Sequence, residues 1–149
     1  MADLRSLPLV RASVPESATF ADAVSALFDA RVPALAVLAG DRVVGVISEI
    51  DVLRGVFPPY LAELRHTAFL DDDPAALDER ALSVRARPVG ELARRVDVLD
   101  GDDSETHAAE RFLHTGEQAL PVVDHGRFLG MLSIAALCHA RLEGAEARR

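Results

Sequence analysis

The sequence of 149 residues contains no lysine, asparagine or tryptophan, and its only cysteine is Cys138. One cysteine excludes an intrachain disulfide and suits a reducing compartment. Long hydrophobic runs are also absent. Because no stretch of about 20 apolar residues occurs, no membrane-spanning helix is predicted. The opening decapeptide, MADLRSLPLV, has no apolar run after its charged residues, unlike a secretory leader. We therefore expect a cytoplasmic protein that makes no membrane contact.

Basic residues are fewer than acidic ones. The chain has 16 basic residues, all of them arginine, against 24 acidic ones, and its formal net charge is −8. Nucleic acids and anionic membranes are bound by basic faces, so neither is an expected partner. A small anionic ligand is not excluded, because its site needs only a few donors. The exclusive use of arginine indicates GC-rich codon usage and a bacterial source.

Two heptapeptides show that the chain is a tandem repeat. GVISEID occupies residues 45–51 and GMLSIAA occupies residues 130–136, so glycine and serine recur at an offset of 85 residues (130 minus 45). The same offset aligns Leu7 with Leu92, Ala23 with Ala108, Ala34-Leu35 with Ala119-Leu120, Val37 with Val122, and Arg42 with Arg127. One supersecondary unit therefore occurs twice.

Hydrophobic periodicity predicts the same elements in each repeat. The first repeat has an extended segment at 10–14, a helix whose N-cap is Thr19 with Asp22 three residues on, two apolar strands at 34–39 and 43–47, and a helix at 49–56. The second has an extended segment at 96–99, a helix capped by Ser104, strands at 120–123 and 128–132, and a helix at 134–142. The predicted fold is α/β (α+β), with two β-α-β-β-α repeats packed as one pseudo-symmetric module.

The repeats set the expected domain boundaries. Residues 1–57 form the first repeat, 88–143 the second, and 144–149 a tail that we expect to fray. Residues 58–87 connect the repeats. This segment is too apolar for a free linker, so we expect it to be partly helical and to pack on the module.

The SEID stretch, residues 48–51, has two interpretations. A serine followed three residues later by an acid at a helix start is a capping box, which needs no functional role. Gly45, however, lies in the strand that feeds this helix, and a glycine there often marks close approach by a backbone or a ligand. The helix N-terminus and Ser48 favour a phosphate, and Asp51 can accept hydrogen bonds from vicinal ribose hydroxyls. The apolar slot for an adenine would come from Val14, Val32, Ala34 and Leu35.

These residues resemble a known family. Two β-α-β-β-α repeats, each with a G-h-h-[ST]-x-x-[DN]-like stretch, are similar to a pair of CBS domains, often called a Bateman module. The resemblance covers about residues 4–56 and 88–142, including ALPVVD at 119–124 and PVGELA at 88–93. It implies clefts between the repeats that bind AMP, ADP, ATP or S-adenosylmethionine, and dimers of modules. It also implies that Asp51 holds the ribose, that Ser48 meets the phosphate, and that Ser133 is its counterpart in the second cleft.

Ala136 departs from the family pattern at the position of Asp51. A methyl group accepts no hydrogen bond from ribose, and losing a charge-assisted bond costs about 1.5–3 kcal/mol. We therefore expect one competent cleft per chain.

Other polar groups have simpler interpretations. His107, Glu110 and His114 share a helix face and suit an acidic solvated surface better than a metal site, so no metal is expected. We expect Cys138 to be a buried apolar residue. Arg65-His66 and Arg94-Arg95 are expected to be surface charges, with contact to a ligand phosphate as the alternative.

Three hypotheses for function follow. The first is a stand-alone regulatory sensor with no cofactor besides the adenosine ligand, acting as a homodimer on an unidentified protein partner. The second is a ligand-free oligomerisation or docking module. The third is an enzyme acting on nucleotides, which we do not favour because the sequence has no G-x-S-x-G, P-loop or H-E-x-x-H motif and so no candidate catalytic residue.

Overall fold

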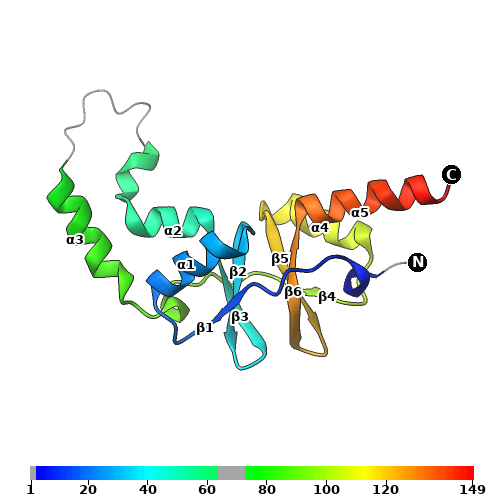
Figure 1. Ribbon diagram of the computed structural model, residues 1–149, viewed down its shortest axis with the longest axis horizontal. Helices are drawn as coiled ribbons and strands as arrows, with labels where there is room; N and C mark the ends of the chain where they lie inside the picture. The colour runs from blue at the N-terminus through cyan, green and yellow to red at the C-terminus, as the bar shows by residue number, and fades with distance from the viewer. Residues whose placement is uncertain (1–2, 64–72) are drawn as a thin grey trace.

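Two three-stranded sheets lie side by side in the computed structural model, which describes residues 3–63 and 73–149. Figure 1 shows the α1–α3 helices at one end of the molecule and α5, near the C-terminus, at the other. The predicted class, with two β-α-β-β-α units, is confirmed. No helix within the described ranges is both long and apolar enough to cross a bilayer.

The first unit is built around a hairpin. Strand β1 (Ser13–Pro15) pairs in parallel with β2 (Ala34–Ala39), and β2 pairs antiparallel with β3 (Arg42–Ser48). Helix α1 (Phe20–Ala30) starts with the predicted capping box of Thr19 and Asp22, and α2 (Glu49–Val56) follows β3 directly. Buried apolar side chains on both hairpin strands explain their nearly continuous hydrophobic sequence.

The second unit repeats this arrangement. Strand β4 (Leu99–Asp100) pairs in parallel with β5 (Ala119–Asp124), which pairs antiparallel with β6 (Arg127–Ser133). Helix α4 (Glu105–Thr115) has Ser104 as its N-cap, as predicted. Helix α5 (Ile134–Ala147) continues into the tail that we expected to fray.

The leading segments of the two units are exchanged. The 3₁₀ helix η1 (Leu4–Ser6) packs on the second unit, where Leu4 is fully buried beside Leu99, and Val10 bridges to Met131. Reciprocally, η3 (Val89–Glu91) packs on the first unit, and Arg94 bridges to Val46. The exchange ties the repeats into one body and brings Arg94 to the first unit.

The connecting segment contains a short 3₁₀ helix, η2 (Pro59–Glu63), and α3 (Pro74–Arg85), which lies against α1 and α2. Asp73 caps α3 by accepting a hydrogen bond from the backbone of Ala76. Val84 is the buried contact of this helix. The candidate residues Arg65 and His66 lie outside the described residues.

Cys138 corrects one expectation, because its side chain is exposed rather than buried. On α5 the neighbouring Leu137 faces the core instead. Leu53, at the equivalent position of α2, is 53% exposed as well. The outer faces of α2 and α5, the last helix of each repeat, therefore carry apolar side chains that do not pack on the core of this chain.

Candidate functional site

The first half of the site is the start of α2. The Ser48 backbone N–H donates to Asp51 Oδ2 at 2.8 Å, and the Asp51 N–H donates to Ser48 Oγ at 3.2 Å. This is the predicted capping box. The Ser48 hydroxyl also donates to Asp51 Oδ2 at 2.9 Å, so the two side chains are held together.

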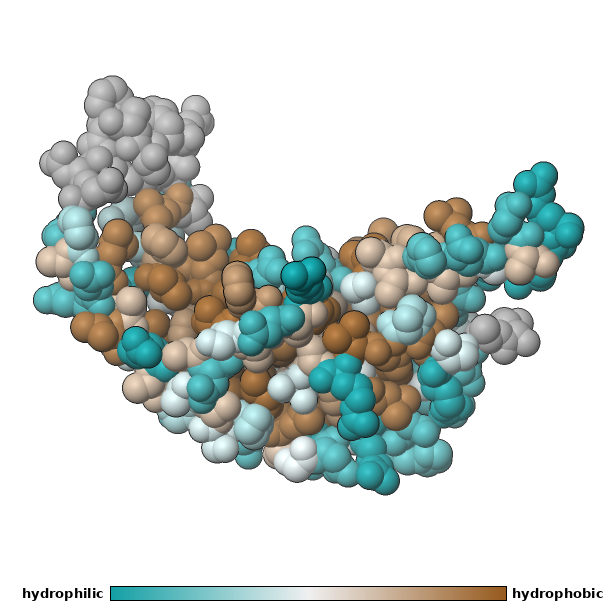
Figure 2. All heavy atoms as spheres, in the orientation of Figure 1, coloured by the Kyte–Doolittle hydropathy of each residue, from teal (hydrophilic) through white to brown (hydrophobic). Residues whose placement is uncertain are grey.

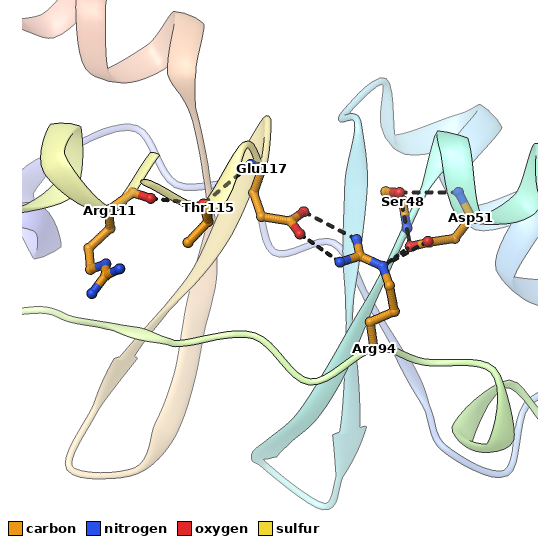
Figure 3. A network of polar contacts seen from close by, with 6 residues as sticks. All are labelled: Ser48, Asp51, Arg94, Arg111, Thr115 and Glu117. Carbon is orange, nitrogen blue, oxygen red and sulfur yellow. Dashed lines mark hydrogen bonds and ion pairs between the residues drawn. The ribbon is translucent and has the colours of Figure 1, made fainter. Parts of the chain in front are cut away.

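The second half comes from the other repeat. The guanidinium of Arg94 donates through Nε to both carboxylate oxygens of Asp51, at 2.7 and 2.9 Å. Its two terminal nitrogens donate to the carboxylate of Glu117, at 2.6 and 3.2 Å. Figure 3 shows Arg94 lying between the two carboxylates. One arginine thus joins the start of α2 to the segment between α4 and β5.

Local structure fixes Glu117 in place. Helix α4 ends at Gly116, whose φ of +71° is left-handed and favours glycine. The Glu117 backbone N–H then donates to Thr115 Oγ1 at 3.2 Å, and the Thr115 hydroxyl donates to the Arg111 carbonyl at 2.8 Å. The side chain of Glu117 is only 12% exposed, so its charge needs the pairing that Arg94 provides.

Charge pairing also sets the ionisation of the site. Burial alone raises the pKa of Asp51, but the hydrogen bonds from Arg94 and Ser48 outweigh it and hold that pKa below its ordinary value. Glu117 and Asp51 together raise the pKa of Arg94. Asp51 and Arg94 are therefore both charged at neutral pH.

Gly45 explains how Arg94 reaches this position. A Cβ at Gly45 would lie 2.8 Å from the carbonyl oxygen of Arg94 and 2.9 Å from the Cβ of Ala93. The Val46 and Arg94 backbones exchange two hydrogen bonds, of 2.8 and 2.9 Å. The close approach expected at Gly45 is therefore made by the exchanged backbone of the second repeat.

Ser48 lines a cleft of about 310 Å³ between the repeats. Its walls are Pro33, Ala34, Ser48, Glu49, Ile50, Arg94, Gly116, Glu117 and Gln118. Asp51 lies behind Arg94 and lines a neighbouring cavity instead. The structure thus brings Ser48, Ala34 and Asp51 to one place, with Arg94 between the cleft and the Asp51 carboxylate.

The counterpart cleft has different chemistry. It is lined by Val10, Arg31, Val32, Pro33, Gln118, Ser133, Ile134 and Ala135. Ser133 accepts the backbone N–H of Ala136 at 3.1 Å and so serves as the N-cap of α5, without a reciprocal carboxylate. Val32 therefore lies with Ser133 and not with Ser48.

All four predicted slot residues belong to the core, and two of them, Val14 and Leu35, line neither cleft. Val14 is 7% exposed and Leu35 is fully buried, and neither lines the two clefts. Their strands, β1 and β2, are neighbours in the first sheet, where Leu35 faces Ile47. A ligand role for these two side chains stays a prediction.

Sequence reasoning missed Glu117. The repeat offset pairs it with Val32, which we expected in a ligand slot, so applying the offset to that slot would have found it. The offset alone does not show that the segment before β5, in the second repeat, faces the motif at residues 45–51 of the first repeat. His107 and His114, the other set-aside candidates, lie 3.7 and 3.6 Å from the carboxylates of Asp103 and Glu110.

Comparisons with known proteins agree with this architecture. The family model of the CBS domain matches residues 2–57 and 89–143. No curated protein matches the chain.

Solved structures give the same result. A CBS domain-containing protein of unknown function from Kribbella flavida is 19% identical, with 95% of this chain and 99% of that chain covered and a TM-score of 0.75. The CBS-pair protein CBSX2 from Arabidopsis thaliana is 23% identical, with 97% of each chain covered and a TM-score of 0.73. A CBS domain protein from Pyrobaculum aerophilum, complexed with AMP, is 25% identical, with 97% and 96% covered and a TM-score of 0.69. The chain belongs to the CBS domain family and carries two CBS domains in tandem.

Proposed function

We propose that this protein is a regulatory sensor that binds an adenosine-containing ligand in the cleft at Ser48, with Asp51, behind Arg94, as the acceptor for its ribose, one ligand per chain. The observation that carries the proposal is the pairing of Ser48 and Asp51 at a helix N-terminus that opens on an inter-repeat cleft. The AMP complex of the similar protein from Pyrobaculum aerophilum supports the ligand class. The second cleft has no carboxylate at Ala136, which supports a single site.

Ligand binding would compete with Arg94 for Asp51. A carboxylate offers about four lone-pair positions. Oδ2 already accepts from the Ser48 N–H, the Ser48 hydroxyl and Arg94, whereas Oδ1 accepts only from Arg94. One ribose hydroxyl can therefore reach Oδ1, but a second requires Arg94 to withdraw.

This competition supplies a signal. When Arg94 leaves Asp51, the link from α2 to Glu117 in the other repeat is broken. A ligand shifts a conformational equilibrium only through different affinities for the two states. Here the difference is the Arg94 contact, which the bound state gives up and the empty state keeps.

A thermal-shift series tests the proposal. The wild type and the Asp51→Asn variant are melted with AMP, ADP, ATP or S-adenosylmethionine at millimolar concentration. We expect one ligand to raise the melting temperature of the wild type, because it binds only the folded state, and not that of the variant. Asp22→Asn is the matched control, because Asp22 is the capping-box acid of α1 and is exposed.

Two outcomes would contradict the proposal: no ligand shifts the wild type, or Asp51→Asn responds as strongly as Asp22→Asn. Either would favour the ligand-free module. The specific observation behind that alternative is that Asp51 already has the partners expected of a structural residue, a cap and an ion pair.

We further propose a homodimer. Phe28 on α1 and Leu113 on α4 occupy equivalent positions and are each 85% exposed. Figure 2 shows hydrophobic residues gathered over α1–α3 and around α4 and α5. The exposed apolar set on α2 and α5 is Ile50, Leu53, Ile134 and Leu142. Exposed apolar side chains that gather on a surface in this way mark interaction sites.

The dimer is tested by the double variant Phe28→Asp/Leu113→Asp. The mass of one chain is 16.0 kDa. We expect light scattering to give twice this mass for the wild type and the mass of one chain for the variant. Asp29→Ala on the same helix is the control, because it changes an exposed charge and no apolar contact. A monomeric wild type would refute this part of the proposal.

A further inference from the structure

A second cavity, of about 330 Å³, lies where α1, α2 and α3 meet, beside the cleft at Ser48. It is lined by Phe20, Ile47, Asp51, Arg54, Gly55, Arg80, Ser83, Val84, Arg87 and Leu92. Its size is within the range of small-molecule pockets, which begins at about 300 Å³. The helix that closes it, α3, comes from the segment that connects the two repeats.

The charge of this cavity is opposite to that of the chain. Three arginines, Arg54, Arg80 and Arg87, line it, whereas the chain as a whole has a net charge of −8. Among the described lining residues the single carboxylate, Asp51, is already paired with Arg94. Over the described ranges no carboxylate lies within 4.0 Å of the Arg54 or Arg80 guanidinium, and Arg87 has one long contact, 3.6 Å to exposed Glu91.

One donor of Arg80 has no acceptor among the described residues. Its Nε is buried and has no hydrogen-bond partner among the described residues, while one terminal nitrogen donates to the Arg54 carbonyl at 3.0 Å. Leaving a charged donor unpaired away from water is unfavourable. An anion in the cavity would supply the missing acceptor. The hydroxyl of Ser83, which also lines the cavity, already donates to the Arg80 carbonyl at 2.8 Å.

The base of the cavity is rigid and apolar. Phe20 is 3% exposed, and Gly55 lets α2 approach its ring so closely that a Cβ there would lie 2.9 Å from Cζ. Val84 of α3 is 7% exposed. A low-dielectric base strengthens the attraction between arginines and an anion above it.

We propose that this cavity binds the phosphoryl group of a small ligand through Arg54, Arg80 and Arg87. Guanidinium groups match phosphate oxygens in geometry as well as in charge. The phosphoryl group can come from a free anion such as pyrophosphate. It can also come from a nucleotide whose ribose reaches Asp51, since Asp51 lines this cavity too.

Calorimetric titration of the full chain with pyrophosphate tests the proposal without any nucleoside. We expect binding by the wild type, and a dissociation constant at least about tenfold higher for Arg54→Gln/Arg80→Gln, as for the loss of a charge-assisted contact. Arg85→Gln is the control, because Arg85 is exposed on the same helix and lines no part of the cavity. Arg80→Lys, which keeps the charge, guards against a loss of folding in the double variant and should retain part of the affinity.

Further arms separate the sources of the phosphoryl group. If ATP displaces pyrophosphate and binds more tightly than adenosine in the wild type but not in Arg54→Gln/Arg80→Gln, the cavity holds the nucleotide tail. If ATP and pyrophosphate do not compete, it holds a free anion. Pyrophosphate binding that survives Asp51→Asn stands even if the sensor proposal fails. No pyrophosphate binding, or equal affinity in the double variant and in Arg85→Gln, would overturn the inference.

Discussion

Replacing Gly45 by valine is expected to lower the free energy of unfolding by about 3 kcal/mol, the upper part of the range for overpacking a core. Even the Cβ would lie 2.8 Å from a backbone oxygen, that of Arg94, and backbone cannot move aside as a flexible side chain can. The added methyl groups increase the clash. The exchanged segment would have to separate from β3, with loss of the two hydrogen bonds between Val46 and Arg94.

Urea unfolding measures this effect. Arg42→Val is the matched control, because it adds the same β-branched residue to an exposed position of the same strand. We expect the control to stay close to the wild type. A Gly45→Val protein as stable as Arg42→Val would show that the close approach of residues 93–94 does not exist.

Replacing Arg94 by methionine is expected to cost about 2 kcal/mol. The change keeps an apolar stem. Among the described residues it leaves the Glu117 carboxylate with no partner and the Asp51 carboxylate with only its hydrogen bonds from Ser48, and each side chain is only 12% exposed. Arg94 itself is 40% exposed, so solvent screening keeps the loss below that of a fully buried pair. The measurement is again urea unfolding, with Arg95→Met as the control for removing an exposed neighbouring charge.

A second variant separates orphaned charge from lost packing. Adding Asp51→Asn and Glu117→Gln to Arg94→Met removes the unpaired charges, so we expect part of the lost stability to return. If the triple variant is less stable than Arg94→Met alone, the carboxylates are not the source of the cost. If Arg94→Met is as stable as Arg95→Met, the ion pairs that Arg94 forms with Asp51 and Glu117 contribute nothing to stability.

The local features of the fold could be predicted from the sequence because they depend on local chemistry. Strand β2 and helix α2 have the predicted bounds, 34–39 and 49–56, since apolar runs and caps define them. The capping boxes at Thr19 and Ser48 followed from a serine or threonine three residues before an acid. The connecting segment, residues 58–87, was expected to be partly helical and to pack on the module, but the contact of α3 with α1 and α2 depends on the tertiary fold.

The site could be predicted only in part. Ser48 and Ala34 line one cleft, with Asp51 in the neighbouring cavity, but Val32 lines the counterpart cleft, and Val14 and Leu35 line neither cleft. Arg94 was expected to be a surface charge, with a ligand phosphate as the alternative, and instead binds two carboxylates. The position of Arg94 results from the exchange of leading segments between the repeats. Hydrophobic periodicity cannot predict this exchange, because it depends on contacts between residues far apart in the chain.

The difference between Asp51 and Ala136 is the basis of the proposed single site. In the first repeat the acid closes the capping box and binds Arg94. In the second, Ser133 caps α5 alone, and the cleft is lined by Arg31 with no carboxylate among its described residues. The two clefts thus have different charge and different donors, although their backbones follow the same repeat.

The most direct test of the central claim is the stoichiometry of nucleotide binding by calorimetric titration. The account predicts one adenosine ligand per chain for the wild type and for Ser133→Ala, and none for Asp51→Asn. Two ligands per chain, or binding that Ser133→Ala abolishes and Asp51→Asn preserves, would contradict it.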